Sequence, residues 1–191
     1  MSETPLIQGQ GLGAVRGERV LFRDVSVVAK PGDLILLRGA NGTGKTTLLR
    51  QLAGLSPPQA GSVDRAGPHH WIGHTNGLKA HETPRTHLRH WARVWGSVDD
   101  IDDILKAMSL RRPADVPSQL LSAGQKRRTA IGRLKLMPRK LWLLDEPFNA
   151  LDTDGQTYLA EMIEQHRADG GAVIAALHGA APIEASGEVS L

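Results

Sequence analysis

The sequence of 191 residues contains no cysteine. Disulfide bonds and thiolate metal sites are therefore excluded, and a reducing cytoplasm is a suitable location. Residues 1–5 lack the basic and apolar segments of a signal peptide, and no apolar run approaches the roughly 20 residues that span a bilayer. If the protein serves a membrane process, we expect another chain to provide the membrane-spanning part.

The remaining composition is typical of a soluble globular domain. Hydrophobic residues make up 40% of the chain and charged residues 23%, with a net charge of +3. The length favours one domain with a full-sized core. The mild basic excess is compatible with docking at an anionic membrane surface but does not establish it.

A glycine-rich stretch at residues 39–46, Gly-Ala-Asn-Gly-Thr-Gly-Lys-Thr, fits the phosphate-loop pattern G-x-x-x-x-G-K-[ST]. It follows a predicted buried strand at 34–37 and precedes a predicted helix at 47–53. Glycines let backbone N–H groups surround an anion, and the start of a helix adds positive potential. We expect Lys45 to reach the β- and γ-phosphates of a nucleotide and Thr46 to hold Mg²⁺. A turn that binds nothing is disfavoured by the flanking strand and helix.

The pattern of apolar residues elsewhere predicts an α/β fold. Strands are expected within 6–38, around 62–63 and 71–72, and at 141–144 and 172–177. Helices are expected at 84–95, 99–110, 124–137 and 154–167. Because the middle of the chain changes to helical character, we expect a helical subdomain at about 76–120, inserted in the α/β core.

Two acids, Asp145 and Glu146, end the predicted strand 141–144. Acids at the end of a buried strand belong at the sheet edge where α/β proteins bind ligands. We expect Asp145 to hold the hydration shell of Mg²⁺ and Glu146 to polarise an attacking water as general base. The alternative is a strand followed by acids that only cap a helix or form a turn.

Residues 121–125, Leu-Ser-Ala-Gly-Gln, stand just before the predicted helix 124–137. Ser122 with the N–H groups at the helix start makes either a second anion site or an ordinary N-cap. Together with the phosphate loop and the two acids, this stretch resembles the LSGGQ-type signature of ATP-binding cassette ATPases. Ala123 replaces the first glycine of that signature.

The resemblance to this family extends over most of the chain. Residues 149–152, Asn-Ala-Leu-Asp, resemble its D-loop and include Asp152, while His178 resembles the switch histidine that contacts the γ-phosphate. The implied fold is a P-loop NTPase core with a mixed sheet, antiparallel N-terminal strands and the helical subdomain, all in one ATP-binding domain of residues 1–191. The implied ligands are ATP and Mg²⁺, the metal being held by Thr46 and Asp145.

The resemblance also implies how each site is assembled. One chain's phosphate loop pairs with the signature loop of a second chain, so we expect an ATP-induced head-to-tail homodimer. The signature-loop residues acting in trans are Leu121, Ser122, Ala123, Gly124 and Gln125. The expected ATP-binding residues are Gly39, Ala40, Asn41, Gly42, Thr43, Gly44, Lys45, Thr46 and Thr47.

Two positions depart from most members of the family. His74 stands where most cassettes carry glutamine, and we expect it to act near the γ-phosphate as a sensor or weak Mg²⁺ ligand beside Glu146 and His178. The aromatic residue that usually stacks on adenine is missing near Val15, and Arg16 is a candidate to stack instead. Residues 179–191 match no pattern.

Three stretches, residues 71–79, 121–128 and 138–152, resemble the heme exporter ATP-binding proteins of bacterial cytochrome c maturation. This resemblance implies an ATPase on the cytoplasmic face of the inner membrane, attached to membrane subunits of a heme exporter. Residues 75–95 are expected to contact that partner. We expect the complex, rather than this chain, to handle heme. A solvated histidine-rich surface is favoured over a metal or heme site for His69, His70, His74, His81, His87 and His90.

Other functions remain open at this stage. The nearest is an ATPase subunit of a cassette transporter for a different substrate. Cassette proteins of translation or DNA repair usually carry two cassettes or long insertions, so we expect no nucleic-acid partner. A P-loop phosphotransferase does not explain residues 121–125, and a non-catalytic nucleotide-binding module is disfavoured by Glu146 and His178.

Overall fold

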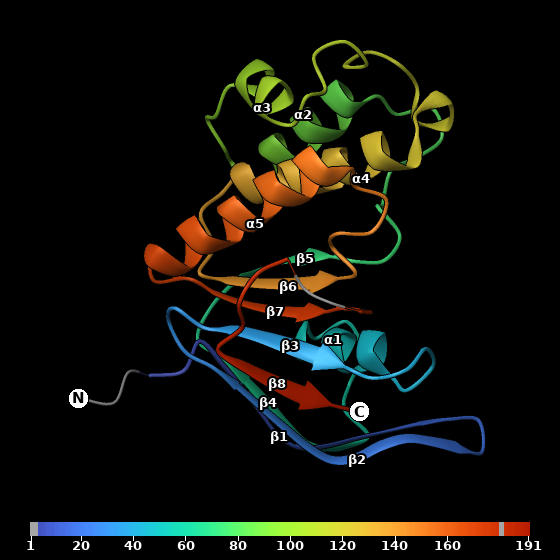
Figure 1. The fold of residues 1–191 in the computed structure, drawn as a ribbon, viewed down its shortest axis with the longest axis vertical. Coiled ribbons are helices and arrows are strands. Elements are labelled where there is room, and N and C mark those ends of the chain that lie inside the picture. The colour runs from blue at the N-terminus through green and yellow to red at the C-terminus, as the bar shows by residue number, and fades with distance from the viewer. Residues whose placement is uncertain (1–3, 180–181) are drawn as a thin grey trace. The chain divides into compact units, whose positions relative to one another are not determined.

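The computed structural model describes residues 4–179 and 182–191 (Figure 1). The chain divides into two compact units. The first unit contains Met1–His74, Arg139–Pro147 and Ala160–Leu191, and the second contains Thr75–Pro138 and Phe148–Leu159. The helical subdomain expected at about 76–120 stays a prediction, because the second unit joins those residues to others further along the chain.

A parallel sheet of five strands forms the centre of the first unit. Its order is β5-β6-β7-β3-β8, and every neighbouring pair is parallel (Figure 1). The strands in the middle of the sheet are buried and almost wholly apolar, as expected where both faces are covered. The five strands are β5 (His69–Ile72), β6 (Leu141–Asp145), β7 (Ala172–Ala176), β3 (Leu34–Arg38) and β8 (Gly187–Ser190).

The N-terminal strands form a second, antiparallel sheet in the order β2-β1-β4. Its strands are β1 (Ile7–Arg16), β2 (Arg19–Ala29) and β4 (Ala60–Arg65). Parallel and antiparallel strands therefore lie in separate sheets, and the predicted α/β P-loop core with antiparallel N-terminal strands is confirmed. Apolar residues of both sheets and of one helix share a single core between them.

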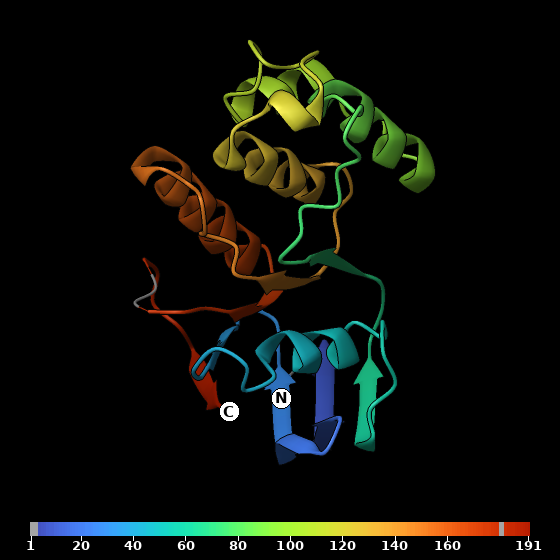
Figure 2. The ribbon, with the colours of Figure 1, turned by 90° about the vertical axis from the view of Figure 1, so that its right-hand side faces the viewer.

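Helix α1 (Lys45–Leu52) lies between the two sheets, as Figures 1 and 2 show from two directions. Leu48, Leu49 and Leu52 are fully buried in the core that both sheets line. The helix follows β3 directly through the phosphate loop, so the position of the loop is determined by this packing. The burial of three leucines contributes on the order of 1.5–3 kcal/mol each.

The second unit is helical. It contains α2 (Pro84–Trp95), α3 (Ile101–Ala107), α4 (Ala123–Gly132), the short 3₁₀ helices Ser118–Leu120 and Arg133–Lys135, and the start of α5 (Thr153–Ala168). Gly132 of α4 packs closely against Leu88 of α2 and Ile104 of α3. No helix in the described part of the chain is both long enough and apolar enough to cross a membrane.

The boundaries of the elements differ from the sequence expectations at three places. Helix α3 stops at Ala107, because Ser109 adopts a left-handed conformation with φ 57°. Helix α4 ends at Gly132 and continues only as a 3₁₀ turn, consistent with the poor helix propensity of glycine. Strand β8 lies in residues 179–191, which matched no pattern, and pairs with β3 as an edge strand.

A stacked pair of rings joins α5 to the parallel sheet. The rings of His166 and Trp142 are 3.9 Å apart at an angle of 9°. Burial lowers the pKa of His166 below its usual value of 6.5, opposed by backbone hydrogen bonds with Lys140 and Ala172. The unfolded chain therefore binds a proton at this histidine more readily than the folded chain does.

We expect His166 to make its full contribution to the free energy of unfolding above about pH 6.5. This contribution should be lost as the pH falls through the lower pKa of folded His166. The substitution His166→Phe keeps an aromatic ring stacked on Trp142 but removes the group that binds the proton. The stability of the variant should therefore depend less on pH. Chemical unfolding at several values between about pH 8 and pH 5 measures the effect. His81→Gln, at an exposed histidine, serves as control, and equal pH dependence of both variants would contradict the prediction.

Candidate functional site

The predicted site residues of the first unit gather at one edge of the parallel sheet. Parallel strands end at the same edge, and β3, β5, β6 and β7 are followed there by the phosphate loop, His74, Glu146 and His178. His74 and His178 are exposed, and Glu146 is half-buried. In α/β proteins this carboxyl edge is where ligands bind.

The phosphate loop begins helix α1 with a glycine in a left-handed conformation. Gly44 has φ 111° and serves as the N-cap of α1. A Cβ atom at this position would lie 2.9 Å from the ring of Phe22 on β2. Only glycine satisfies both the backbone angle and this close approach. Strand β2 therefore packs against the phosphate loop, which the sequence pattern did not indicate.

Lys45 is nearly buried and folds back over the loop. Its Nζ atom donates hydrogen bonds to the carbonyl oxygens of Gly39, at 2.6 Å, and Ala40, at 3.2 Å. The ammonium group therefore lies within the curve of the loop, where the N-terminal N–H groups of α1 also point. This arrangement concentrates positive potential at one place, as an anion site requires.

The hydroxyl of Thr46 donates a hydrogen bond of 2.9 Å to Oδ2 of Asp145. Asp145 ends β6 and is only 1% exposed. The two side chains thus bring oxygen atoms together from α1 and from the sheet edge. Oxygen ligands are those that Mg²⁺ prefers, and it commonly uses one or two protein groups together with water and phosphate. The residues present therefore fit a magnesium ion.

A larger cluster of metal ligands is not found in residues 4–179 and 182–191: no three histidines, cysteines or acids are placed together to hold a metal. The Thr46–Asp145 pair does not need one, since phosphate and water complete the shell of a nucleotide-bound Mg²⁺.

Glu146 has an unusual backbone conformation for a residue other than glycine. Its φ is 51°, and its N–H donates to the carbonyl oxygen of Ala176 at 2.9 Å. Left-handed residues of this kind occur often at functional sites, where the surrounding structure holds the strained conformation. Arg16, the residue expected near adenine, is exposed at the end of β1 and pairs across the hairpin with Arg19.

The signature loop belongs to the second unit, where Ser122 forms an N-cap of α4. Its Oγ accepts from the N–H of Gln125 at 3.1 Å, and Oε1 of Gln125 accepts from the N–H of Ser122 at 2.9 Å. This reciprocal capping box is the ordinary role that the sequence left open. The hydroxyl of Ser122 still has its own proton to donate.

The signature loop and the D-loop pack against each other within the second unit. A Cβ atom on Gly124 would lie 2.8 Å from the carbonyl oxygen of Ala150. Arg128 of α4 forms an ion pair with Asp152. A hydrogen bond from the N–H of Gly155 and the Arg128 guanidinium hold the pKa of Asp152 below its usual value. We call Gly124, Arg128, Ala150 and Asp152 the signature–D-loop contact.

Sequence reasoning did not single out Arg128 as a site residue. The available signal was a basic residue two turns into the helix that follows the signature loop, with an acid in the D-loop to pair with it. That signal becomes meaningful only when the two loops are known to be neighbours.

The expectation of a solvated histidine-rich surface is wrong for two of the six histidines. His70 and His87 are each only 1% exposed. His70 points to the buried face of β5, and Nδ1 of His87 lies 2.8 Å from Oε2 of Glu82. Burial lowers the pKa of His87, and the Glu82 hydrogen bond opposes this shift.

Comparison with known proteins identifies the class of this chain. The family model described as "ABC transporter" matches residues 22–149, a span that contains the phosphate loop, the signature loop and both acids. A solved structure of the ATP binding subunit of an ABC transporter superposes with a TM-score of 0.80, at 25% identity over 91% of this chain and 79% of that one. The chain belongs to the ABC transporter family, and it is an ATP-binding ATPase of that family.

Curated relatives narrow the assignment. The Cytochrome c biogenesis ATP-binding export protein CcmA of Hyphomonas neptunium is 55% identical over 100% of this chain and 99% of that protein. The proteins of the same name from Methylococcus capsulatus and Maricaulis maris are each 45% identical and cover 94% and 88% of this chain. Within the ABC transporters, this chain therefore belongs with the CcmA proteins.

The close approach of Gly124 to Ala150 generates a prediction. The substitution Gly124→Ala should lower the free energy of unfolding by about 1–3 kcal/mol, because the added methyl group overpacks the signature–D-loop contact. It should also slow ATP hydrolysis by displacing the D-loop.

The matched control is Gly67→Ala, the same substitution at a position where an added Cβ atom meets nothing within 4 Å. Urea unfolding and steady-state ATP hydrolysis are measured for both variants. If Gly124→Ala hydrolyses ATP as fast as Gly67→Ala, the contact does not position the D-loop.

Proposed function

We propose that this chain is the ATP-hydrolysing subunit of an ABC-type complex that exports or delivers heme for the biogenesis of c-type cytochromes. The observation that carries the ATPase chemistry is the hydrogen bond between Thr46 and Asp145, directly beside Glu146 at the carboxyl edge of the sheet. The names of the relatives, which refer to cytochrome c biogenesis and export, support the choice of process. In this proposal residues 1–191 form one ATP-binding domain with its helical subdomain at about 76–120.

The phosphate loop supplies the electrostatic part of the reaction. Lys45 exchanges its carbonyl partners, Gly39 and Ala40, for oxygens of the β- and γ-phosphates, which are stronger acceptors. The N–H groups of residues 39–47 surround the same oxygens. Thr46 and Asp145 hold Mg²⁺, which neutralises charge that develops on the phosphates.

Glu146 is the general base. Its carboxylate orients and deprotonates the water that attacks the γ-phosphate, and its left-handed backbone keeps the side chain at the sheet edge. His178 and His74 follow the strands on either side of β6 and act as sensors near the γ-phosphate. Arg16 stacks on or near the adenine.

Two copies of the chain complete the two sites. Residues Leu121, Ser122, Ala123, Gly124 and Gln125 of one copy bind the nucleotide held by the phosphate loop of the other, in a head-to-tail homodimer. Membrane subunits of a heme exporter bind residues 75–95, which places the chain on the cytoplasmic face of the cell membrane. Heme is handled by the complex, and no nucleic acid takes part.

The role of Glu146 is tested with the purified protein. We expect Glu146→Gln to lower the rate of ATP hydrolysis by roughly 10²–10⁴-fold, because the amide cannot accept the proton from water. The affinity for ATP should stay the same, since Glu146 contacts the water rather than the phosphates. Glu161→Gln, an exposed substitution of the same kind on α5, is the control. A loss of nucleotide affinity equal to the loss of rate would remove Glu146 as the base.

The assigned process is tested in cells whose only copy carries Glu146→Gln. We expect c-type cytochromes to disappear from heme-stained gels while b-type heme remains, because only covalent heme attachment requires the exporter. Unchanged c-type levels would leave the ATPase chemistry in place and point to a transporter of a different substrate.

A further inference from the structure

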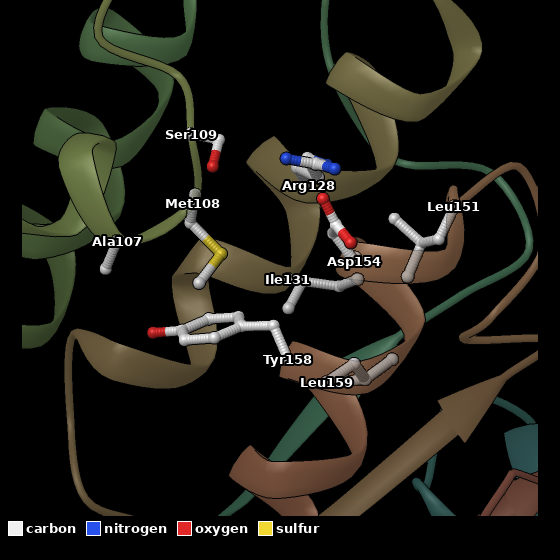
Figure 3. A pocket seen from close by; sticks show the side chains of 10 residues that line it. Ala107, Met108, Ser109, Arg128, Ile131, Leu151, Asp154, Tyr158 and Leu159 are labelled. Carbon is white, nitrogen blue, oxygen red and sulfur yellow. The ribbon is translucent and has the colours of Figure 1, made fainter.

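A cavity of about 220 Å³ lies within the second unit. None of the predicted catalytic, metal-binding or ATP-binding residues lines it, although Arg128 of the signature–D-loop contact and Leu151 of the D-loop do. Its walls come from the end of α3, from α4 and from the first two turns of α5 (Figure 3). The neighbouring Arg128–Asp152 ion pair gives the cavity a polar side.

Apolar side chains form the inner wall of the cavity. The side chains of Met108, Ile131 and Tyr158 point into the same space, as Figure 3 shows, and Leu159 closes the inner end. Met108 and Ile131 are buried, at 3% and 2% exposed. A cavity of about 150 Å³ with apolar walls is large enough for benzene. This one can therefore hold a single aromatic ring or a short branched alkyl chain.

The charge at the mouth is negative. Arg128 and Asp152 neutralise each other in their ion pair. Asp154, in the first turn of α5, lines the cavity and is exposed. Within the described residues its carboxylate forms no hydrogen bond or ion pair, so one carboxylate at the mouth remains available to a ligand. This charge favours a cation over an anion of the same size.

We propose that this cavity binds a small organic cation with an aromatic or short aliphatic body, the class of the arylalkylamines. The ammonium group pairs with Asp154, and the body of the ligand contacts Met108, Ile131 and Tyr158. The face of the Tyr158 ring attracts a cation, and the Met108 sulfur makes favourable contacts with aromatic rings. The argument for this site does not depend on the proposed ATPase chemistry.

Calorimetric titration of the full chain with two probes tests the proposal. 2-Phenylethylamine and 3-phenylpropionate have similar size and opposite charge, so they separate the charge preference from simple filling of an apolar space. We expect the amine to bind about tenfold more tightly, since it gains an attraction that the carboxylate replaces by repulsion. Equal affinities of the two probes, or no binding of the amine, would overturn the proposal.

Three variants locate the binding. Asp154→Asn should weaken amine binding about fivefold and leave propionate binding no weaker, whereas Glu161→Gln on the same helix should change neither. Ala107→Leu fills the cavity from α3 and should abolish amine binding while ATP still binds. Amine binding that survives in both Asp154→Asn and Ala107→Leu, each still folded by its unfolding curve, would place the probe elsewhere and overturn the proposal.

Discussion

The hydrogen bond between Thr46 and Asp145 depends on the packing of the whole first unit. Asp145 ends β6, which is separated in the sheet from β3 by β7. Thr46 reaches it because α1 packs against β6 and β7 as well as against β1. That packing comes from the buried leucines of α1, so the apolar core shared by two sheets is what brings a hydroxyl to a carboxylate. The position of Thr46 relative to Asp145 is therefore a consequence of the burial of leucines further along α1.

Most of the site in the first unit could be predicted because it rests on local patterns and one general rule. The phosphate loop consists of consecutive residues, and the acids follow an apolar strand directly. Parallel strands end at one edge, so their following residues meet even when they are far apart in sequence. The buried strands β3, β6 and β7 were recognisable for the same reason, since a strand covered on both faces must be apolar throughout.

Features that depend on distant partners were missed. Strand β8 has a mixed, half-exposed sequence, and it is held by β3, about 150 residues earlier in the chain. The burial of His70 and His87 depends on which face of β5 or α2 meets the core, and polar residues at such positions carry no apolar signal. Arg128 acquires its partner only through the approach of α4 to the D-loop. In each case the information lies in a contact rather than in a segment.

The signature–D-loop contact combines two interactions of unequal strength. The ion pair of Arg128 and Asp152 is partly in water, with the Asp152 side chain 68% exposed, so it contributes little and is weakened by salt. The approach of Gly124 to Ala150 is steric, and salt does not affect it. The backbone contact is therefore the stronger link between the two loops, and the ion pair is the weaker one. Since Arg128 also lines the cavity beside Asp154, the weaker of the two interactions is the one that a bound cation can perturb.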